Sequence, residues 1–243
     1  MDNISLYEDI KARTGGEIYL GVVGPVRTGK STFIRRFMDL CVIPSILDPN
    51  EKKRIIDELP QAGVGKTVMT TEPKFIPKTG IEIPLSNNVK AKFRLIDCVG
   101  YIVDSAQGVY EDDKERLVKT PWFDENIPFS KAAQTGTEKV IRDHSTIGIV
   151  MTTDGSIGEF TRDDYISAEE KAIMELKKIK KPFIVIVNST FPASDFTRKI
   201  ANEISEKYEV TALPMDCENL NKEDVNKISV SYTHLRAHET LMN

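Results

Sequence analysis

The segment at 24–31 reads GPVRTGKS and fits the pattern G-x-x-x-x-G-K-[ST]. Residues 17–23 (EIYLGVV) precede it and form a short apolar run that predicts a buried strand. Residues 31–40 follow it and space their apolar side chains along one helical face. A strand, a glycine loop and a helix in this order predict a loop that wraps a phosphate group, and this loop constrains the fold more than any other feature.

The residue types in this loop suit a nucleoside triphosphate with Mg²⁺. Gly24 and Gly29 let the backbone approach the phosphates with its N–H groups pointing inward. Lys30 supplies a point charge for the β- and γ-phosphates, and the Ser31 hydroxyl is a ligand for Mg²⁺. The other residues expected to contact the nucleotide here are Pro25, Val26, Arg27, Thr28 and Thr32.

Predicted strands and helices alternate along the rest of the chain. Strands are expected within 73–96 (two of them), at 146–152, at 182–188 (PFIVIVN) and at 210–213. Helices are expected around 131–144, 163–181 and 195–207, whereas 42–72 and 99–130 are predicted to be mostly loop. This order predicts an α/β fold of the P-loop NTPase class, with a mostly parallel, GTPase-like sheet covered by helices on both faces.

Composition excludes several other classes of protein. The chain has 243 residues with a net charge of −4, and its sequence pI of about 5.6 argues against a general nucleic-acid binder. Its three cysteines lie far apart without the spacing of a zinc site, so we expect inert thiols in a reducing cytoplasm. We expect neither a signal peptide nor a membrane-spanning helix.

A second motif follows the strand predicted to end at residue 96. Asp97, at the strand end, can hold Mg²⁺ through water opposite Ser31, and the Gly100 backbone N–H can meet the γ-phosphate. Between the two motifs, Thr70 and Thr71 precede a predicted strand. One of them is expected to sense the γ-phosphate and complete the Mg²⁺ shell, although strand-favouring threonines without a ligand would give the same pattern.

Neighbouring residues leave the hydrolytic chemistry open. Tyr101 stands where many small GTPases have a glutamine that orients the attacking water, which predicts slow hydrolysis or another group in that role. Arg27 can neutralise transition-state charge from within the loop or simply face solvent. The segment GVGKT at 63–67 imitates a phosphate loop, but proline rather than glycine stands at position 60, so we interpret it as a flexible loop.

The end of the strand at 182–188 bears on the choice of base. GTPases of this topology carry [NT]KxD here, where the aspartate accepts two hydrogen bonds from guanine. This chain keeps Asn188 but has Ser189 in place of the lysine and Phe191 in place of the aspartate. Without that carboxylate the strong guanine contact is missing, which predicts ATP or relaxed base choice, with Asn188 still at the nucleotide.

Several longer strings resemble the stage IV sporulation protein A family, the ATP-hydrolysing morphogenetic proteins of the spore coat in endospore-forming bacteria. The resemblance covers about residues 4–229. The strings are RTGGEIYLGVVG (13–24), VRTGKSTFI (26–34), GKTVMTTEPKF (65–75), DCVGY (97–101), TPWFDENIPF (120–129), HSTIGIVMTTDGSIG (144–158) and KPFIVIVNS (181–189).

This resemblance implies a GTPase-like domain that has switched to ATP and uses hydrolysis to polymerise into a static layer around the forespore, in the mother-cell cytoplasm. It implies Lys30 as the phosphate lysine, Asp97 as the Mg²⁺-associated aspartate, and Thr70 and Thr71 as the sensor threonines. These four form the expected catalytic set, and Ser31, Thr70 and Asp97 the expected metal ligands. The implied partners are further copies of the chain, a small membrane-binding peptide at the forespore membrane, and other coat proteins.

The resemblance also bears on domain boundaries. The family has middle and C-terminal regions, the latter needed to attach to the membrane-binding peptide, and we expect both to be missing here. Residues 230–240 read VSYTHLRAHET and look like translated sequencing adapter. We therefore expect a GTPase-like ATP-binding domain at 1–229 and a non-native tail at 230–243.

Two other functions fit the loop motif. A regulatory GTPase switch would use the same fold, but Ser189 and Phe191 count against guanine. A small-molecule kinase would need an arginine-rich lid, and the predicted loops contain no clear arginine cluster. A structural ATPase, whose hydrolysis licenses assembly, is the leading hypothesis.

Overall fold

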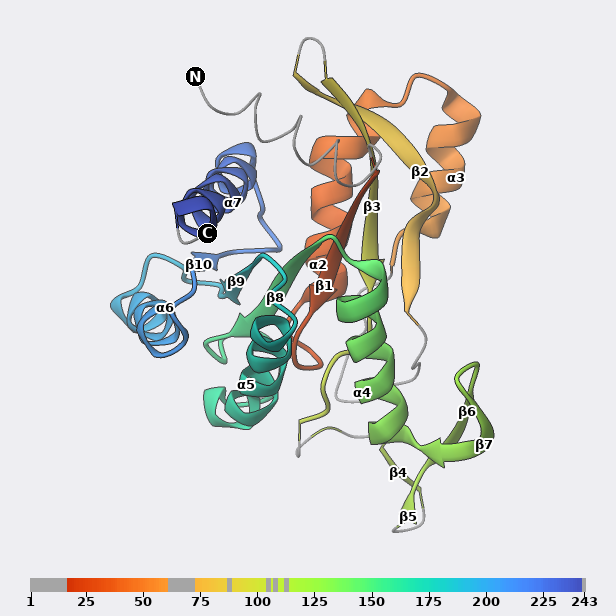
Figure 1. Cartoon of the computed structure of the whole chain (residues 1–243), viewed down its shortest axis with the longest axis vertical. Coiled ribbons are helices and arrows are strands. Elements are labelled where there is room, and N and C mark those ends of the chain that lie inside the picture. Colours follow the sequence, from red (N-terminus) through yellow and green to blue (C-terminus); the bar gives the residue numbers. More distant parts are fainter. Residues whose placement is uncertain are drawn as a thin grey trace.

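The computed structural model describes residues 17–60, 73–86, 89–103, 106, 109–111 and 114–241. Among these residues a six-stranded sheet runs through the centre in the order β10-β9-β8-β1-β3-β2 (Figure 1). Its parallel strands are β1 (Glu17–Val23), β3 (Val89–Asp97), β8 (Ile147–Thr153), β9 (Phe183–Asn188) and β10 (Ala212–Met215). β2 (Lys74–Ser86) pairs antiparallel with β3 at one edge. The prediction of a mostly parallel sheet is confirmed.

Helices cover both faces of this sheet, as predicted. One core contains side chains of α2 (Lys30–Phe37), α3 (Pro49–Glu58) and α7 (Lys222–Leu241). The other contains side chains of α4 (Phe129–Lys139), α5 (Arg162–Lys178) and α6 (Asp195–Tyr208). Successive strand residues point to opposite faces, so Val22 packs in the first core and Val23 in the second, and both are fully buried. Each such valine contributes about 1.5–3 kcal/mol on burial.

Local sequence explains where the helices begin. In α5, Thr161 and Asp164 form a capping box, in which the Asp164 carboxylate accepts from the Thr161 backbone N–H at 2.7 Å. In α6, the Ser194 hydroxyl accepts from the Thr197 N–H at 3.2 Å. α2 starts differently, because Gly29 adopts a left-handed conformation and no side chain caps the helix. Its first N–H groups are thus available to a ligand.

Parallel strands bring several loops to one edge of the sheet. β1 lies between β3 and β8, with Leu20 in register with both Leu95 and Ile147. The carboxyl end of β1 leads into the glycine loop, β3 ends at Asp97 and β9 ends at Asn188. Ligands of open α/β sheets bind at this edge, so the topology brings together the glycine loop, Asp97 and Asn188.

The structure corrects some sequence predictions. The segment 42–72 was predicted as loop, but it contains a 3-10 turn (Ile43–Ser45) and α3, which Pro49 opens at its first position after the capping residue Asp48. The segment 99–130 contains two small hairpins rather than mostly loop: β4 (Tyr110–Glu111) with β5 (Lys114–Glu115), and β6 (Leu117–Thr120) with β7 (Phe123–Pro128).

The other boundaries move little. The predicted helix at 131–144 is α4 followed by a π-helical turn (Val140–His144), and α2 ends in a similar turn (Met38–Val42). Within α5, Ile173 and Leu176 are fully buried, whereas Ile166 is 39% exposed. α7 continues through the expected domain boundary at 230.

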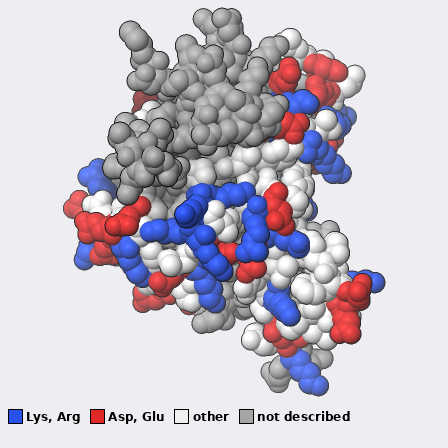
Figure 2. All heavy atoms as spheres, viewed as in Figure 1, with Lys and Arg blue, Asp and Glu red and all other residues white. Residues whose placement is uncertain are grey.

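The surface of the described residues mixes both signs of charge. Figure 2 shows Lys and Arg concentrated across the middle of one face, over α4 and α5, with Asp and Glu around them. Two lysines in the last turn of α5 and just after it have structural roles. Lys177 donates to the Tyr208 carbonyl at 2.7 Å, and Lys181 donates to the Arg142 carbonyl at 3.0 Å. No helix within the described part of the chain has the length and apolarity to cross a bilayer.

Candidate functional site

The glycine loop between β1 and α2 has the conformation that its glycines permit. Gly24 and Gly29 have φ angles of 129° and 86°, which favour glycine over other residues. A Cβ at Gly24 would lie 2.1 Å from the Met151 carbonyl oxygen. Arg27 also has a positive φ of 62°, and the Tyr165 hydroxyl donates to its carbonyl at 3.5 Å. The loop is therefore folded back tightly over the ends of β1 and β8.

Lys30 is held inside this loop. Its Nζ donates to the carbonyl oxygens of Pro25 at 2.5 Å and Gly24 at 3.5 Å, and the residue is only 5% exposed. Burial lowers the pKa of the Lys30 ammonium, although Cys98 and Asp97 act in the opposite direction. Among the described residues this ammonium has no ion-pair partner, so it is well placed to gain from an anionic ligand. Thr32 follows in the first turn of α2.

Ser31 and Asp97 meet across the site from separate elements. The Ser31 hydroxyl, at the start of α2, donates to Asp97 Oδ2 at 2.9 Å, at the end of β3. Asp97 Oδ1 is buried and has no hydrogen-bond partner within the described part of the chain. Burial raises the pKa of Asp97 in spite of the Ser31 hydrogen bond.

This pair fits a divalent cation. A carboxylate oxygen without a partner, beside a hydroxyl, offers the hard oxygen ligands that Mg²⁺ prefers, and the phosphates and waters would supply the remainder. Ser31 and Asp97 would hold the metal between them. The third expected metal ligand, Thr70, and its neighbour Thr71 lie outside the described residues, as does the imitation loop at 63–67.

The segment after Asp97 is bonded to the phosphate loop. The Tyr101 N–H donates to the Gly24 carbonyl at 3.1 Å, and the Val26 N–H donates to the Tyr101 carbonyl at 2.9 Å. Gly100 has a φ of 93°, and a Cβ there would lie 2.1 Å from the Gly24 oxygen and 2.7 Å from Lys30 Nζ. Glycine at this position therefore lets the two loops and the lysine come together.

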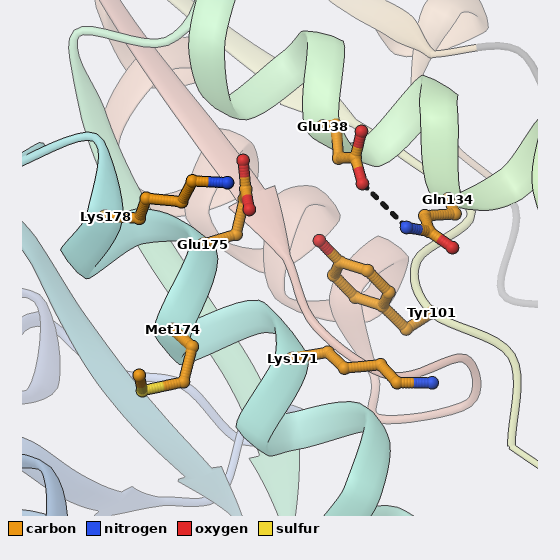
Figure 3. A pocket seen from close by; sticks show the side chains of 7 residues that line it. All are labelled: Tyr101, Gln134, Glu138, Lys171, Met174, Glu175 and Lys178. Carbon is orange, nitrogen blue, oxygen red and sulfur yellow. Dashed lines mark hydrogen bonds between the residues drawn. The ribbon is translucent and has the colours of Figure 1, made fainter.

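The Tyr101 side chain takes no part in this contact. It points into a groove of about 450 Å³ between α4 and α5, toward Glu138 and Glu175 (Figure 3). On the groove wall, Gln134 donates to Glu138 at 2.7 Å. Burial, with smaller effects of the two glutamates, raises the pKa of Tyr101. Tyr101 is thus a neutral residue of the wall between the helices and does not replace the water-orienting glutamine.

Asn188 joins three segments of the site. Its amide nitrogen donates to the Thr28 carbonyl at 3.1 Å, and its amide oxygen accepts from the Cys217 N–H at 3.1 Å. A Cβ on Gly29 would lie 2.3 Å from that amide nitrogen. Asn188 was predicted to contact the nucleotide, and in the structure its side chain also positions the glycine loop. This role spans 160 residues of sequence, so no local motif reveals it.

The turn after β9 separates two residues of the altered base motif. Ser189 is fully buried, and its hydroxyl accepts from the Phe191 N–H at 2.9 Å. Phe191 is 70% exposed, and Phe196 on α6 is 59% exposed. In the described structure, neither position of the motif offers a lysine or a carboxylate to a base. The sequence therefore lacks the residues that bind guanine, and the conformation of the turn also uses the Ser189 side chain for an internal hydrogen bond.

Sequence reasoning missed a buried polar cluster beside this turn. Asp154 directly follows β8, and its carboxylate accepts from the Thr197 hydroxyl of α6 at 2.6 Å and from the Ser156 N–H at 2.9 Å. The signal was a polar run, TTDG, at a strand end on the ligand edge of the sheet.

Two of the three cysteines, Cys98 and Cys217, are buried free thiols, and burial raises the pKa of Cys98 to about 11. These thiols are protonated at neutral pH, as expected for inert cysteines.

Comparison with known proteins gives a consistent result. A family described as "Stage IV sporulation protein A, ATPase domain" matches residues 1–233. Curated relatives named stage IV sporulation protein A come from Clostridioides difficile strain 630 (54% identical), Bacillus subtilis strain 168 (50%) and Bacillus anthracis (48%). Each alignment covers at least 93% of this chain and 46% of the relative, so the chain spans about half of their length.

Solved structures are more distant. A crystal structure of an SsGBP variant aligns with a TM-score of 0.49 and 14% identity, over 99% of this chain and 64% of that one. That likeness is too weak to bear on function.

Proposed function

Because this chain belongs to the stage IV sporulation protein A family and carries its ATPase domain, we propose that it binds ATP with Mg²⁺ at the loop 24–31 and hydrolyses it. We further propose that hydrolysis drives self-assembly into the basement layer of the spore coat. The observation that carries the proposal is the 2.9 Å contact between Ser31 and Asp97, which leaves one buried carboxylate oxygen for a cation.

Each residue of the site has a proposed role. Lys30 exchanges its bonds to loop carbonyls for bonds to the β- and γ-phosphates, and the N–H groups at the start of α2 bind the same oxygens. Ser31 and Asp97 would hold Mg²⁺, which would supply positive charge beside the phosphates. The Gly100 N–H meets the γ-phosphate. Thr70 or Thr71 senses it and completes the metal shell.

The proposed nucleotide is ATP rather than GTP. Ser189 is buried and bonded internally, and the exposed side chain two residues on is a phenylalanine. Guanine would therefore meet no carboxylate for its N–H donors at this turn, and polar groups left unpaired on binding lower affinity. No feature of the described site favours the alternative, a regulatory GTPase switch.

The cellular part of the proposal reaches beyond this chain. We place the protein in the mother-cell cytoplasm at the outer surface of the forespore, on the basis of its family. Its proposed partners are further copies of itself, a small membrane-binding peptide and other coat proteins. The chain spans about half the length of its relatives. We propose that attachment to the membrane depends on the C-terminal region of the longer family members. The proposed domain is 1–229, with 230–243 as a non-native tail.

Phosphate release from ATP with and without Mg²⁺ tests the enzymatic part. Lys30→Ala should abolish ATP binding and turnover, because a buried charge aimed at the phosphates is lost. Lys199→Ala, on an exposed lysine of α6, is the matched control and should behave as wild type. Thr70→Ala with Thr71→Ala should spare binding and impair hydrolysis. Normal turnover by the Lys30→Ala chain would contradict the proposal.

A further inference from the structure

Hydrogen bonds with two serine hydroxyl groups hold the turn after β9 in place. The buried Ser189 hydroxyl accepts from the Phe191 N–H at 2.9 Å and from the Ser156 hydroxyl at 3.3 Å. The Ser156 hydroxyl in turn accepts from the Thr190 N–H at 3.0 Å. The backbone of the turn is therefore bonded to the loop that follows β8, while the ring of Phe191 stays 70% exposed.

Thr197 lies at the centre of this network. It is fully buried in the first turn of α6, and its hydroxyl lies 2.6 Å from Asp154 Oδ2, 3.2 Å from the Ser189 hydroxyl and 2.8 Å from the Ser194 hydroxyl. A hydroxyl has one proton to donate. The shortest contact and the charged acceptor both belong to Asp154, so the Thr197 proton goes to that carboxylate.

Asp154 anchors the network from the neighbouring strand. Only 7% exposed, it follows β8 directly and accepts from the Ser156 N–H at 2.9 Å. Burial alone raises the pKa of its carboxyl group, but hydrogen bonds from Ser156, Ser189 and Thr197 outweigh burial and bring the pKa below its ordinary value. An ionised carboxylate bonded to hydroxyls thus joins the β8 loop, the β9 turn and α6.

We infer that Asp154 and Thr197 are positioning residues for base binding, which hold the turn 189–194 so that the ring of Phe191 stacks on the purine of the bound nucleotide. This inference rests on the proposed ATP site. The Ser189 hydroxyl is bonded within the turn, and the turn offers guanine neither a lysine nor a carboxylate. The aromatic face supplies affinity for the base, and a base stacked on an aromatic side chain contributes about 1–3 kcal/mol.

The test compares nucleotides with a probe that has no base. Equilibrium affinities are measured for ATP, GTP and inorganic tripolyphosphate, all with Mg²⁺, on the full chain. Thr197→Val removes the hydroxyl and nearly keeps the shape of the side chain. It should lower the affinity for ATP about tenfold, as partial loss of one stacked base predicts. Its affinity for tripolyphosphate should not change. Phe191→Ala should give the same pattern.

Two control variants separate positioning from folding. Thr197→Ser keeps the hydroxyl and should restore the affinity for ATP. Thr120→Val alters a buried threonine whose hydroxyl has no hydrogen-bond partner within the described residues, and it should leave all three affinities unchanged. Circular dichroism and thermal unfolding of every variant monitor the fold.

Each contrary result has a separate meaning. If Thr197→Val lost affinity for ATP and for tripolyphosphate equally, the network would have only a structural role, and the inference would be overturned. Unchanged ATP affinity in that variant would overturn it as well. A wild-type chain that binds ATP no better than tripolyphosphate would exclude base stacking while the phosphate site stands. A wild-type chain that binds neither probe would remove the proposed function itself.

Discussion

The buried carboxylate of Asp97 lowers the stability of the fold at the position proposed to hold the metal. It is buried beside Lys30, yet one of its oxygens has no partner among the described residues. Burial raises the pKa of its carboxyl group above that in the unfolded chain. Ionisation of Asp97 therefore opposes folding until a cation compensates it. Sites that bind a ligand commonly retain such unsatisfied groups.

The pH dependence of Asp97→Asn follows from this raised pKa. Below the unfolded pKa of about 3.9 the carboxyl group is protonated in both states and the cost is absent. The cost grows as pH rises through the window up to the folded pKa, and above that it is complete. At pH 7 the variant without nucleotide should gain about 1 kcal/mol in free energy of unfolding, or roughly 2–4 °C in Tm.

Thermal unfolding at pH 7 and near pH 4 measures this gain, with exposed Asp57→Asn as the control. Added Mg²⁺ and ATP should raise the Tm of the wild type and leave that of Asp97→Asn nearly unchanged. A less stable Asp97→Asn chain at pH 7 would show that the carboxylate is satisfied within the protein.

Single residues differ in how far sequence reveals them. Lys30, Ser31, Asp97 and Gly100 belong to local motifs whose chemistry fixes both residue type and spacing, and the structure brings all four together. The positioning contact of Asn188 with Thr28 crosses 160 residues and depends on the register of the sheet. Pattern alone could place Asn188 near the site but not assign its partners.

At the scale of elements, a buried ion pair within α5 is hydrogen-bonded to Thr152 of β8. Arg162 donates to both oxygens of Glu169, at 2.5 and 2.9 Å, and also to the Thr152 hydroxyl at 3.1 Å. Glu169 is 1% exposed. These bonds tie α5 to the end of β8, and the loop that begins with Asp154 connects the two elements. The rigidity of that loop therefore depends partly on α5.

Breaking one side of this pair should cost more than removing both. Glu169→Gln leaves the Arg162 charge without its buried partner and should lower the free energy of unfolding by about 3 kcal/mol. The double variant Arg162→Met with Glu169→Leu should regain much of that loss, because the buried charges are gone. Urea unfolding of the wild type, of Arg162→Met, of Glu169→Leu and of the double variant forms a complete cycle. Equal destabilisation in Glu169→Gln and in the double variant would argue that packing, not charge, dominates.

Elements with strong periodicity were predictable and irregular ones were not. The apolar runs of β1, β8 and β9 and the amphipathic face of α6 fixed their type. α3 was missed because only Ile55 of its ten residues is buried. The hairpins β4–β5 and β6–β7 were missed because their strands are short and partly exposed.

At the scale of the whole molecule, the fold brings three functions to one edge of the sheet. β1 and α2 present the loop proposed to bind phosphates, β3 presents the carboxylate proposed to hold the metal, and the ends of β8 and β9 present the turn proposed to meet the base. Alternation of strands and helices predicted this arrangement, since parallel strands place their carboxyl ends together. The family of the chain adds the sporulation context.

The central claim is that this site takes ATP with Mg²⁺ through the 24–31 loop. Competition binding of ATP against GTP on the chain, with and without Mg²⁺, tests it most directly, with Lys30→Ala as the loss-of-site control. We predict Mg²⁺-dependent binding, a clear preference for ATP and loss of binding in Lys30→Ala. A preference for GTP would mean that another loop reads guanine, and would contradict this account in favour of a GTPase switch.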